Sequence, residues 1–426
     1  MRFVLSAFVI ILFVMTHVSC LKDKCTETST FIQYRPVFVT PEEYKIPITL
    51  SEPDSLKEPG KIYFYRSYIL INEVRKGIHL INNEHPENPV NMGFIKIPGN
   101  ADMAVMNNVL YADSYTDLLV INLNNPLQPF LLERRENVFQ SFYFSEGSNR
   151  ILSHFEKTNI TRKMDCSDYG YGTRFFQEND GTVLFDNAFG SADVFSSSSN
   201  GTPQVGQGGS LARFTISKGH LYAVGSAEIY ALPIISGGLT GEATVTELPW
   251  GIETIFPFKN YLFLGANNGM HIMEIENPVQ PQLRSTFTHA RACDPVVVDD
   301  NIAYVTLRTG EFACPGDKNE LQVLDVTDVY KPTLISAFPM ENPHGLGFFN
   351  NQLYICEGAS GLKIFDKTDV RFIGQHLLAQ VKEVSAKDVI AVRENLLLLI
   401  GDDGFYQFDT SDSDNILLLS KIPVEK

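Results

Sequence analysis

The sequence predicts an all-β chain folded as a β-propeller of about eight four-stranded blades, with seven blades as the alternative count. A strand-like motif recurs about every 40 residues, a proline-containing turn follows most copies, and no stretch shows a convincing helical period. Four β-rich segments in each repeat are typical of propeller blades. Tandem β-sandwiches are the rival all-β architecture, but they would need longer Greek-key units than this even repeat provides.

The recurring motif reads Leu-x-Val-Ile-Asp or a close variant, and we assign it to the third strand of each blade. The copies at Ile78 and Leu118 start 40 positions apart, and those at Leu321, Leu362 and Phe405 follow at steps of 41 and 43. The step of 51 positions from Met270 to Leu321 contains a local insertion over residues 308–319. Six copies are present: Ile78–Asn82, Leu118–Asn122, Met270–Glu274, Leu321–Asp325, Leu362–Asp366 and Phe405–Asp409.

The segments around the motif predict the other three strands. An apolar strand such as 102–106 comes first, and a polar turn such as Asn107-Asn108 joins it to a Leu-Tyr-type strand. Asn and Asp tolerate positive φ, as a tight hairpin requires. After the motif, a turn such as Asn125-Pro126 leads to the fourth strand.

These segments resemble the LVIVD-repeat family of bacterial and archaeal surface or envelope proteins, which is named for its third-strand motif. The similarity covers roughly Gly60 to Ile422, and it rests on the Gly-Leu-Lys-Ile-Phe-Asp and Leu-Leu-Val-Ile-Asn stretches and the Asn-Pro turns. The resemblance implies a propeller fold and a surface location, but no established chemistry.

The predicted domains are a signal peptide over 1–20, an N-terminal extension over 21–59 and the propeller over 60–426. A polar, partly glycine-rich insertion at about 158–209 interrupts the third blade, and Gly181–Asp186 is a candidate for the third strand of that blade. The glycines of this insertion suggest a partly mobile loop.

The N-terminus predicts export. Arg2 precedes an apolar run from Phe3 to Met15, which is too short to span a bilayer comfortably and is typical of a signal h-region. The ending Val-Ser-Cys20 resembles a bacterial lipoprotein signal, although His17 departs from the usual Leu. We therefore predict lipidation of Cys20 and an outer membrane lipoprotein of the cell envelope, periplasmic or surface-exposed. Ordinary signal cleavage and an uncleaved anchor are the alternatives.

The net charge of the chain limits the classes of partner that it can bind. The chain has 34 basic and 50 acidic residues, a net charge of −16, and no Lys/Arg cluster. Nucleic acid is therefore excluded as a partner, because phosphate binding needs a basic footprint. We predict a monomer.

The phase of the repeat places a polar residue at the start of nearly every inner strand, where it would ring the mouth of the central channel. Buried charge must be paired or solvated, so these residues are ligand-binding candidates: Asp102, Gln140, Arg213, Glu253, Asp294, His344 and Asp388, with Lys61 as an eighth member. Hard divalent cations such as calcium prefer carboxylate oxygens. The metal-ligand candidates are Asp102, Glu253, Asp294, His344 and Asp388. Alternatively, the side chains cap backbone N–H groups of the interblade turns and hydrate the channel.

The preferred function is a non-enzymatic, envelope-anchored scaffold that binds a protein or saccharide partner through its mouth face and insertion loops. The alternative is an exported metal-dependent hydrolase or lyase that uses His344 with Asp294 or Glu253 as acid and base. No nucleophile elbow, zinc-protease helix, phosphate-binding glycine loop or EF-hand loop is found in the sequence.

Cysteines and aromatic residues mark the same face. Cys293, Cys314 and Cys356 map to the mouth side, where Cys293–Cys314 or Cys314–Cys356 could form a disulfide, and free thiols are the alternative. Cys166 could pair with Cys25. The lone tryptophan, Trp250, is expected at the mouth. Four aromatic residues of the insertion are candidates for partner contact: Tyr169, Tyr171, Phe175 and Phe176.

Overall fold

The computed structural model describes residues 26–139, 145–146, 150–165, 175–177, 183–186, 205–235, 238–289, 291–293, 295–309, 316, 318–393, 395–413 and 415–425. The chain forms two compact units. The larger comprises Phe38–Ser153 and Gly190–Lys426, and the smaller comprises Met1–Val37 and His154–Phe189. Across these described ranges, no helix has the length and apolar character needed to cross a membrane.

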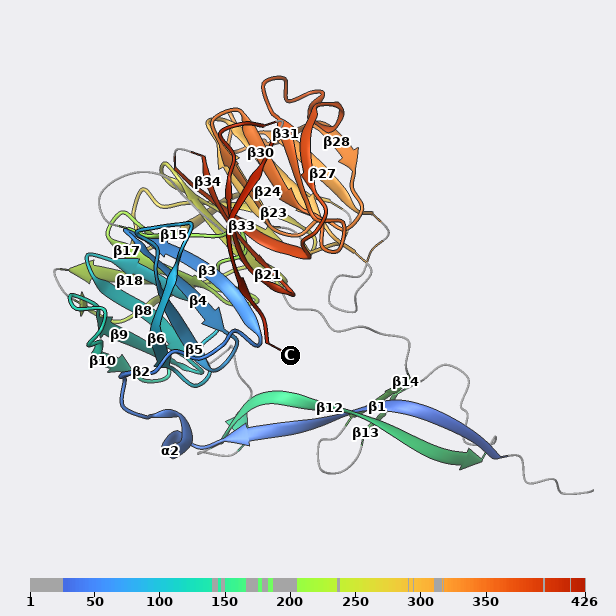
Figure 1. Cartoon of the computed structure of the whole chain (residues 1–426). Helices are drawn as coiled ribbons and strands as arrows, with labels where there is room; N and C mark the ends of the chain where they lie inside the picture. Colours follow the sequence, from blue (N-terminus) through green and yellow to red (C-terminus); the bar gives the residue numbers. More distant parts are fainter. Residues whose placement is uncertain are drawn as a thin grey trace, which may run out of the picture. The chain divides into compact units, whose positions relative to one another are not determined.

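The larger unit is a propeller of seven four-stranded antiparallel blades (Figure 1). Blade 1 contains β3 (Pro59–Tyr65), β4 (Tyr68–Glu73), β5 (Gly77–Asn82) and β6 (Val90–Lys96). Blade 2 contains β7 (Met103–Met106), β8 (Val109–Ser114), β9 (Asp117–Asn122) and β10 (Phe130–Arg135). Blade 3 contains β16 (Phe214–Ser217), β17 (His220–Val224), β18 (Glu228–Ile235) and β20 (Thr244–Glu247), with β19 (Gly238–Leu239) paired to the end of β18.

The remaining four blades follow without long interruption. Blade 4 contains β21 (Ile252–Phe258), β22 (Tyr261–Ala266), β23 (Gly269–Glu274) and β24 (Gln282–Thr288). Blade 5 contains β25 (Val296–Asp299), β26 (Ile302–Leu307), β27 (Glu320–Asp325) and β28 (Thr333–Pro339). Blade 6 contains β29 (Leu346–Phe349), β30 (Gln352–Cys356), β31 (Leu362–Asp366), the 3-10 helix η3 (Ile373–Gln375) and β32 (Leu377–Val381). Blade 7 contains β33 (Ala386–Arg393), β34 (Leu396–Gly401), β35 (Gly404–Asp409) and β36 (Leu417–Pro423).

The predicted propeller is therefore confirmed with the alternative count of seven blades, and the count of eight is wrong. The strand predicted for the extra blade exists as β14 (Val183–Asp186), but it pairs with β1 (Thr26–Val39) of the N-terminal extension, with Tyr34 opposite Val183. In the smaller unit β14 also pairs with β13 (Phe175–Gln177), and β12 (Arg150–Asp165) lies on the other side of β1. Because these strands pair with the N-terminal extension, they form no further blade.

Three short elements complete the larger unit. The helix α2 (Pro41–Tyr44) begins with a capping box between Thr40 and Glu43. The strand β2 (Leu50–Ser51) adds to the outer edge of blade 1 beside β6, and β11 (Ser145–Glu146) pairs with the start of β12.

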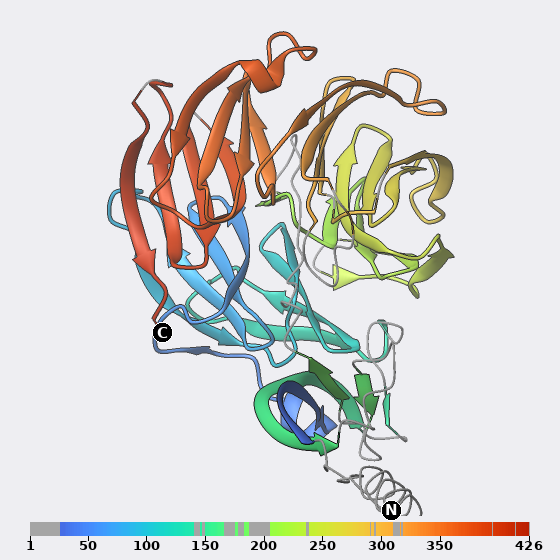
Figure 2. The same ribbon diagram turned by 90° about the vertical axis from the view of Figure 1, so that its right-hand side faces the viewer.

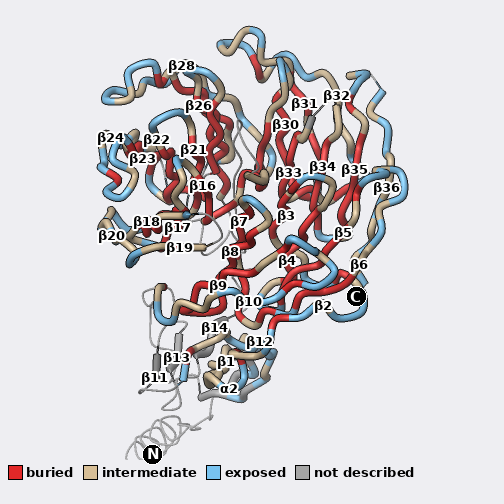
Figure 3. The backbone as a smooth tube through the Cα atoms, turned by 90° about the vertical axis from the view of Figure 1, so that its left-hand side faces the viewer, coloured by how far each residue is buried: buried red, intermediate tan, exposed pale blue. Residues whose placement is uncertain are grey.

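Turn chemistry and burial explain why the repeat folds as blades. Asn107 and Asn108 both have positive φ, 52° and 62°, in the hairpin between the first two strands of blade 2. The motif strand that follows is core, since Leu118, Leu119, Val120 and Ile121 are fully buried. Figure 3 shows this gradient, with buried inner strands and more exposed outer strands such as β36.

A β-bulge between the third and fourth strands recurs in six of the seven blades. Bulges of this kind increase the local twist of an outer strand and make its free edge a poorer template for pairing with other chains.

Blades 1 and 7 close the ring without exchanging strands, and Figure 2 shows the C-terminal blade beside the N-terminal one. The side-chain amides of Asn83 and Gln407 hydrogen-bond reciprocally at 2.8 and 2.7 Å. The Ser420 hydroxyl donates to the carbonyl of Pro86 at 2.6 Å, as the Ser336 hydroxyl does to Val370 between blades 5 and 6. The closing interface therefore uses the same serine contact as an interior one.

Candidate functional site

A segment of the chain crosses the central channel of the propeller. Residues 205–213, which we call the crossing segment, lead from the insertion into blade 3. Its strand β15 (Gln207–Gly208) pairs with the free, channel-facing edge of β3, and Val205 bridges to Met106 at the end of β7. The Gln207 amide donates to the carbonyl of Ala391 in blade 7 at 3.2 Å. The segment thus touches inner strands of blades 1, 2 and 7.

Glycine makes this crossing possible. A Cβ on Gly206 would lie 2.2 Å from the ring of Tyr63, and one on Gly209 would lie 2.1 Å from the carboxylate of Asp388. The expectation of a mobile glycine loop is therefore wrong for these residues, where glycine allows close packing of backbone against side chain.

Asp388 holds the crossing segment from blade 7. Its side chain is buried, and its Oδ1 accepts hydrogen bonds from the Ser210 N–H at 3.0 Å, the Ser210 hydroxyl at 3.1 Å and the Val389 N–H at 2.9 Å. The Leu211 N–H approaches Oδ2 at 3.4 Å. Burial raises the pKa of Asp388 to about 8, because it penalises the charged form more than these donors favour it.

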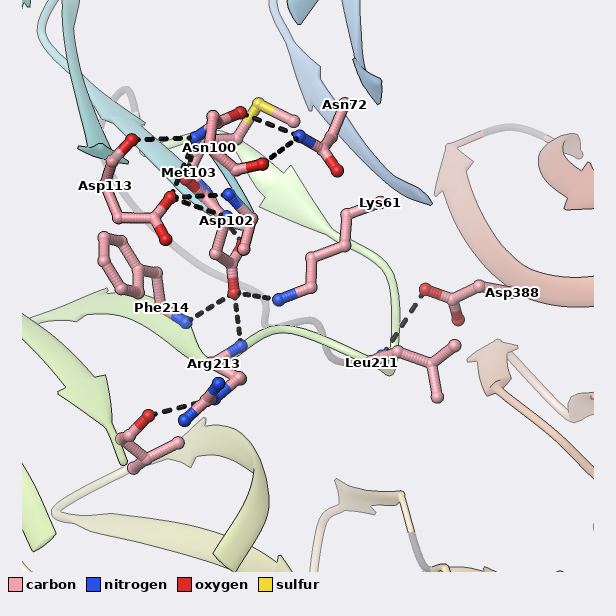
Figure 4. A network of polar contacts seen from close by, with 12 residues as sticks. Lys61, Asn72, Asn100, Asp102, Met103, Asp113, Leu211, Arg213, Phe214 and Asp388 are labelled. Carbon is pink, nitrogen blue, oxygen red and sulfur yellow. Dashed lines mark hydrogen bonds and ion pairs between the residues drawn. The ribbon is translucent and has the colours of Figure 1, made fainter. Parts of the chain in front are cut away.

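Asp102 holds the end of the segment from blade 2. Its Oδ2 accepts hydrogen bonds from the backbone N–H groups of Arg213 and Phe214, the latter at 3.0 Å, and pairs with the Lys61 ammonium at 2.5 Å. The Lys61 and Asp102 side chains are only 3% and 4% exposed. This carboxylate therefore joins blades 1, 2 and 3 (Figure 4).

The structure thus brings together three of the predicted ring residues, Lys61, Asp102 and Asp388, around the crossing segment. Their polar atoms bind the chain's own backbone and one another, in line with the alternative prediction that ring residues cap N–H groups. Arg213 contributes its backbone N–H to this arrangement, and its guanidinium donates to the carbonyl of Val224 at 3.1 Å.

A second set of carboxylates, at the ends of second strands, was missed by the sequence reasoning. Asp113 Oδ1 accepts hydrogen bonds from the backbone N–H groups of Ala101 and Asp102 at 2.8 and 2.9 Å, and burial raises its pKa to about 6. Glu73 and Glu357 each accept two N–H bonds from the loop that precedes their own blade. The available signal was an acidic residue directly after the apolar part of each of these strands.

A cavity of about 240 Å³ opens at the mouth, beside the crossing segment. His344 lines this cavity, and its pKa is lowered to about 3, first by burial and then by the positive charges of Arg308 and Lys387. The imidazole is therefore neutral at physiological pH. Other charged or titratable residues of the lining are Lys57, Glu58, Lys61, Arg75, Lys387, Asp388 and Asp402.

Of the remaining ring residues, only Glu253 is among the described residues, and it does not lie with His344. Glu253 does not line the cavity, and its Oε1 lies 3.6 Å from the sulfur of Cys293. Gln140 and Asp294 lie outside the described residues. In the part of the chain that the structure describes, no three His, Cys, Asp or Glu side chains are grouped to hold a metal ion. Of the predicted acid–base set, the described cavity contains His344 alone.

The cysteine prediction is partly resolved. Cys293 is disulfide-bonded, and its partner, like Cys314, is beyond the described ranges. Cys356 is a buried free thiol whose pKa burial raises well above its usual value, so the Cys314–Cys356 pairing is wrong. Cys20, Cys25 and Cys166 also fall outside the described residues.

Trp250 lies in the loop that joins blades 3 and 4, on the mouth face, by which we mean the face where the inner strands begin. It is 70% exposed, the highest value among the large apolar side chains that the structure describes. Of the insertion aromatics, Phe175 and Phe176 belong to β13, while Tyr169 and Tyr171 are not among the described residues.

Comparison with known proteins gives no family. No family model matches the chain, and no curated protein sequence does. Among solved structures it is similar to the computationally designed Ika8 protein, with 10% identity, a TM-score of 0.47, and 88% of this chain and 90% of that chain covered. BamB from Moraxella catarrhalis is 6% identical, with a TM-score of 0.45, and the match covers 88% of this chain and 96% of that chain. Sqt1 from Saccharomyces cerevisiae is 12% identical, with a TM-score of 0.46, and the match covers 89% of this chain and 98% of that chain. Identities and TM-scores this low carry no argument about function.

Proposed function

We propose that the protein is an exported, envelope-anchored scaffold that binds a protein partner through the mouth face of its propeller, without catalysis. The observation that carries the proposal is Trp250, whose large apolar side chain is 70% exposed on that face. Tryptophan is enriched among the residues that dominate the free energy of protein–protein binding. A folded protein gains nothing for its own stability from leaving such a side chain in water.

The contacts of the carboxylates in the channel favour a binding role for the protein over a catalytic one. Asp102 and Asp388, two of the predicted metal-ligand candidates, accept hydrogen bonds from the start of blade 3 and from the crossing segment. Groups held in this way fix the blades relative to one another. A rigid ring that presents loops is a suitable base for partner recognition.

Anchoring is part of the same proposal. The apolar run from Phe3 to Met15 and the Val-Ser-Cys20 ending that follows it support export and lipidation of Cys20. Lipidation would place the propeller at the cell envelope as an outer membrane lipoprotein, periplasmic or surface-exposed. The resemblance to LVIVD-repeat proteins agrees with that location.

Site-specific photo-cross-linking in intact cells tests the binding surface. A photoreactive residue in place of Trp250 is expected to yield a discrete cross-linked product with one protein. The same residue in place of Tyr330 is the matched control, because Tyr330 is also aromatic, is 60% exposed, and lies in a turn at the opposite end of its blade. Equal products at both positions, or none at 250, would contradict the proposal.

The anchor is tested in the same cells. Cys20→Ala is expected to abolish incorporation of a labelled fatty acid and to reduce the cross-link from position 250 by lowering the amount of protein at the envelope. Cys25→Ala, five positions further on, should leave both signals unchanged. Fatty-acid labelling that survives Cys20→Ala would exclude Cys20 as the lipidated residue.

A further inference from the structure

The mouth cavity is lined by more basic than ionised acidic side chains, although the protein has a net charge of −16. Four cationic side chains line it: Lys57, Lys61, Arg75 and Lys387. Two acidic residues of the lining oppose them, Glu58 and Asp402, while the buried carboxyl of Asp388 is largely protonated at neutral pH. The potential of Arg308 and Lys387 that disfavours protonation of His344 would equally attract an anion.

The cations of the cavity differ in how far they are already neutralised. Lys57 pairs with Asp54 at 2.9 Å, Lys61 with Asp102 at 2.5 Å, and Lys387 with Asp402 at 2.7 Å. Arg75 has no ion pair with any residue in the described part of the chain, and its side chain is exposed. The backbone of Arg75 is held in place, because its N–H donates to the carbonyl of Asn100 at 2.9 Å and its carbonyl accepts from the N–H of Gly99 at 2.8 Å.

His344 adds a neutral polar group to the same wall. Its backbone N–H is bonded to the carbonyl of Cys356 at 2.7 Å, while its imidazole makes no hydrogen bond to a described residue. A neutral imidazole can donate one hydrogen bond to an anion without adding charge. The cavity therefore offers one unpaired guanidinium, partly neutralised ammonium groups and an uncharged donor.

We propose that this cavity binds a carboxylate group, with Arg75 as its principal charged contact. The planar guanidinium presents two parallel N–H donors that match the two oxygens of a carboxylate. A cavity of about 240 Å³ lies below the range of pockets for drug-sized ligands, roughly 300–1,000 Å³. It suits a small organic acid or one acidic side chain. If the carboxylate belongs to a protein partner, the inference rests on the proposed function. If the carboxylate belongs to a free organic acid, the inference is independent of that function.

Binding of succinate to the purified mature protein is the test, measured by calorimetry at constant ionic strength against its neutral diamide, succinamide. Succinate is expected to bind and succinamide is not. Arg75→Gln should weaken succinate binding at least about tenfold, since a charge-assisted hydrogen bond is lost. Arg66→Gln is the matched control: this arginine also has a positive φ, 59° against 61° for Arg75, and lies in the hairpin at the other end of β3. It should bind succinate as the unmodified protein does.

Two further binding measurements show whether the carboxylate comes from a protein partner or from a free acid. A glutamate-rich peptide that binds at least about tenfold more tightly than succinate, while its glutamine counterpart does not bind, assigns the site to a partner protein. Succinate binding without peptide binding assigns it to a free acid. Failure of both ligands, an unchanged affinity in Arg75→Gln, or tighter binding of inorganic phosphate than of succinate would overturn the proposal. None of these results depends on the cross-link at position 250, so the two proposals fail separately.

Discussion

Asp102→Ala is expected to lower the free energy of unfolding by about 3–5 kcal/mol, the cost of breaking a buried ion pair by removing one partner. The substitution leaves the Lys61 ammonium buried without its carboxylate and deprives the N–H groups of Arg213 and Phe214 of their acceptor. Because one carboxylate joins three blades, the loss should appear as a single cooperative shift of the urea midpoint.

Asp54→Ala is the matched control for that loss. Asp54 also pairs with a lysine of the same region, Lys57, but the two side chains are 53% and 49% exposed. Exposed ion pairs contribute little, so the urea midpoint should stay close to that of the unmodified protein. Equal losses for the two variants would show that the Lys61–Asp102 pair does not hold the ring together.

The second large effect is a fall in stability with rising pH. Burial raises the folded-state pKa of Asp388 to about 8, against an ordinary value of 3.8 for this side chain. Its contribution is therefore fully present below about pH 4 and is lost as the pH rises through 8. In this range the slope is at most about 1.4 kcal/mol per pH unit, so the free energy of unfolding should fall by about 1–2 kcal/mol between pH 6.5 and pH 8.

Between pH 6.5 and pH 8 the effect of Asp388 can be told apart from that of groups whose contribution to stability is lost as the pH falls. His344 has its pKa depressed to about 3, so the stability linked to it is present above pH 6.5 and is lost only as the pH falls. Asp388→Asn should remove most of the decline between pH 6.5 and pH 8 in urea titrations. Asp402→Asn should retain the decline, because the pKa of Asp402 is lowered and the group is already ionised. A decline of the same size in Asp388→Asn would assign it to another group.

The local features of the blades could be predicted from the sequence because each depends on neighbouring residues. The apolar run in Leu118–Asn122 predicts a buried strand, and Asn107-Asn108 predicts a tight hairpin; both are confirmed. The phase of the repeat also placed Lys61, Asp102 and Asp388 at one end of the inner strands. The structure shows that these three surround a single segment.

The partners of those residues could not be predicted, because they come from distant parts of the chain. Nothing local to Gln207-Gly208 indicates pairing with Tyr63 and Phe64, more than 140 positions earlier. The same holds for Val183–Asp186, whose apolar residues predict a strand but not its neighbour. For this reason the predicted count of eight blades is one too high. The carboxylates of Asp113 and Glu357 were overlooked because their role as hydrogen-bond acceptors becomes clear only once the N–H groups of the loops are placed.

Amide hydrogen exchange across residues 205–213, followed by mass spectrometry, tests most directly whether the crossing segment is part of the folded ring. The N–H groups of Gly206, Gly209 and Ser210 are bonded to Val105, Ile62 and Asp388, at 2.9, 3.4 and 3.0 Å. They are expected to exchange about as slowly as the buried strand β7, since opening them requires the ring to open. Complete exchange within seconds, while β7 stays protected, would contradict the assignment of Asp102 and Asp388 to holding the chain across its own channel.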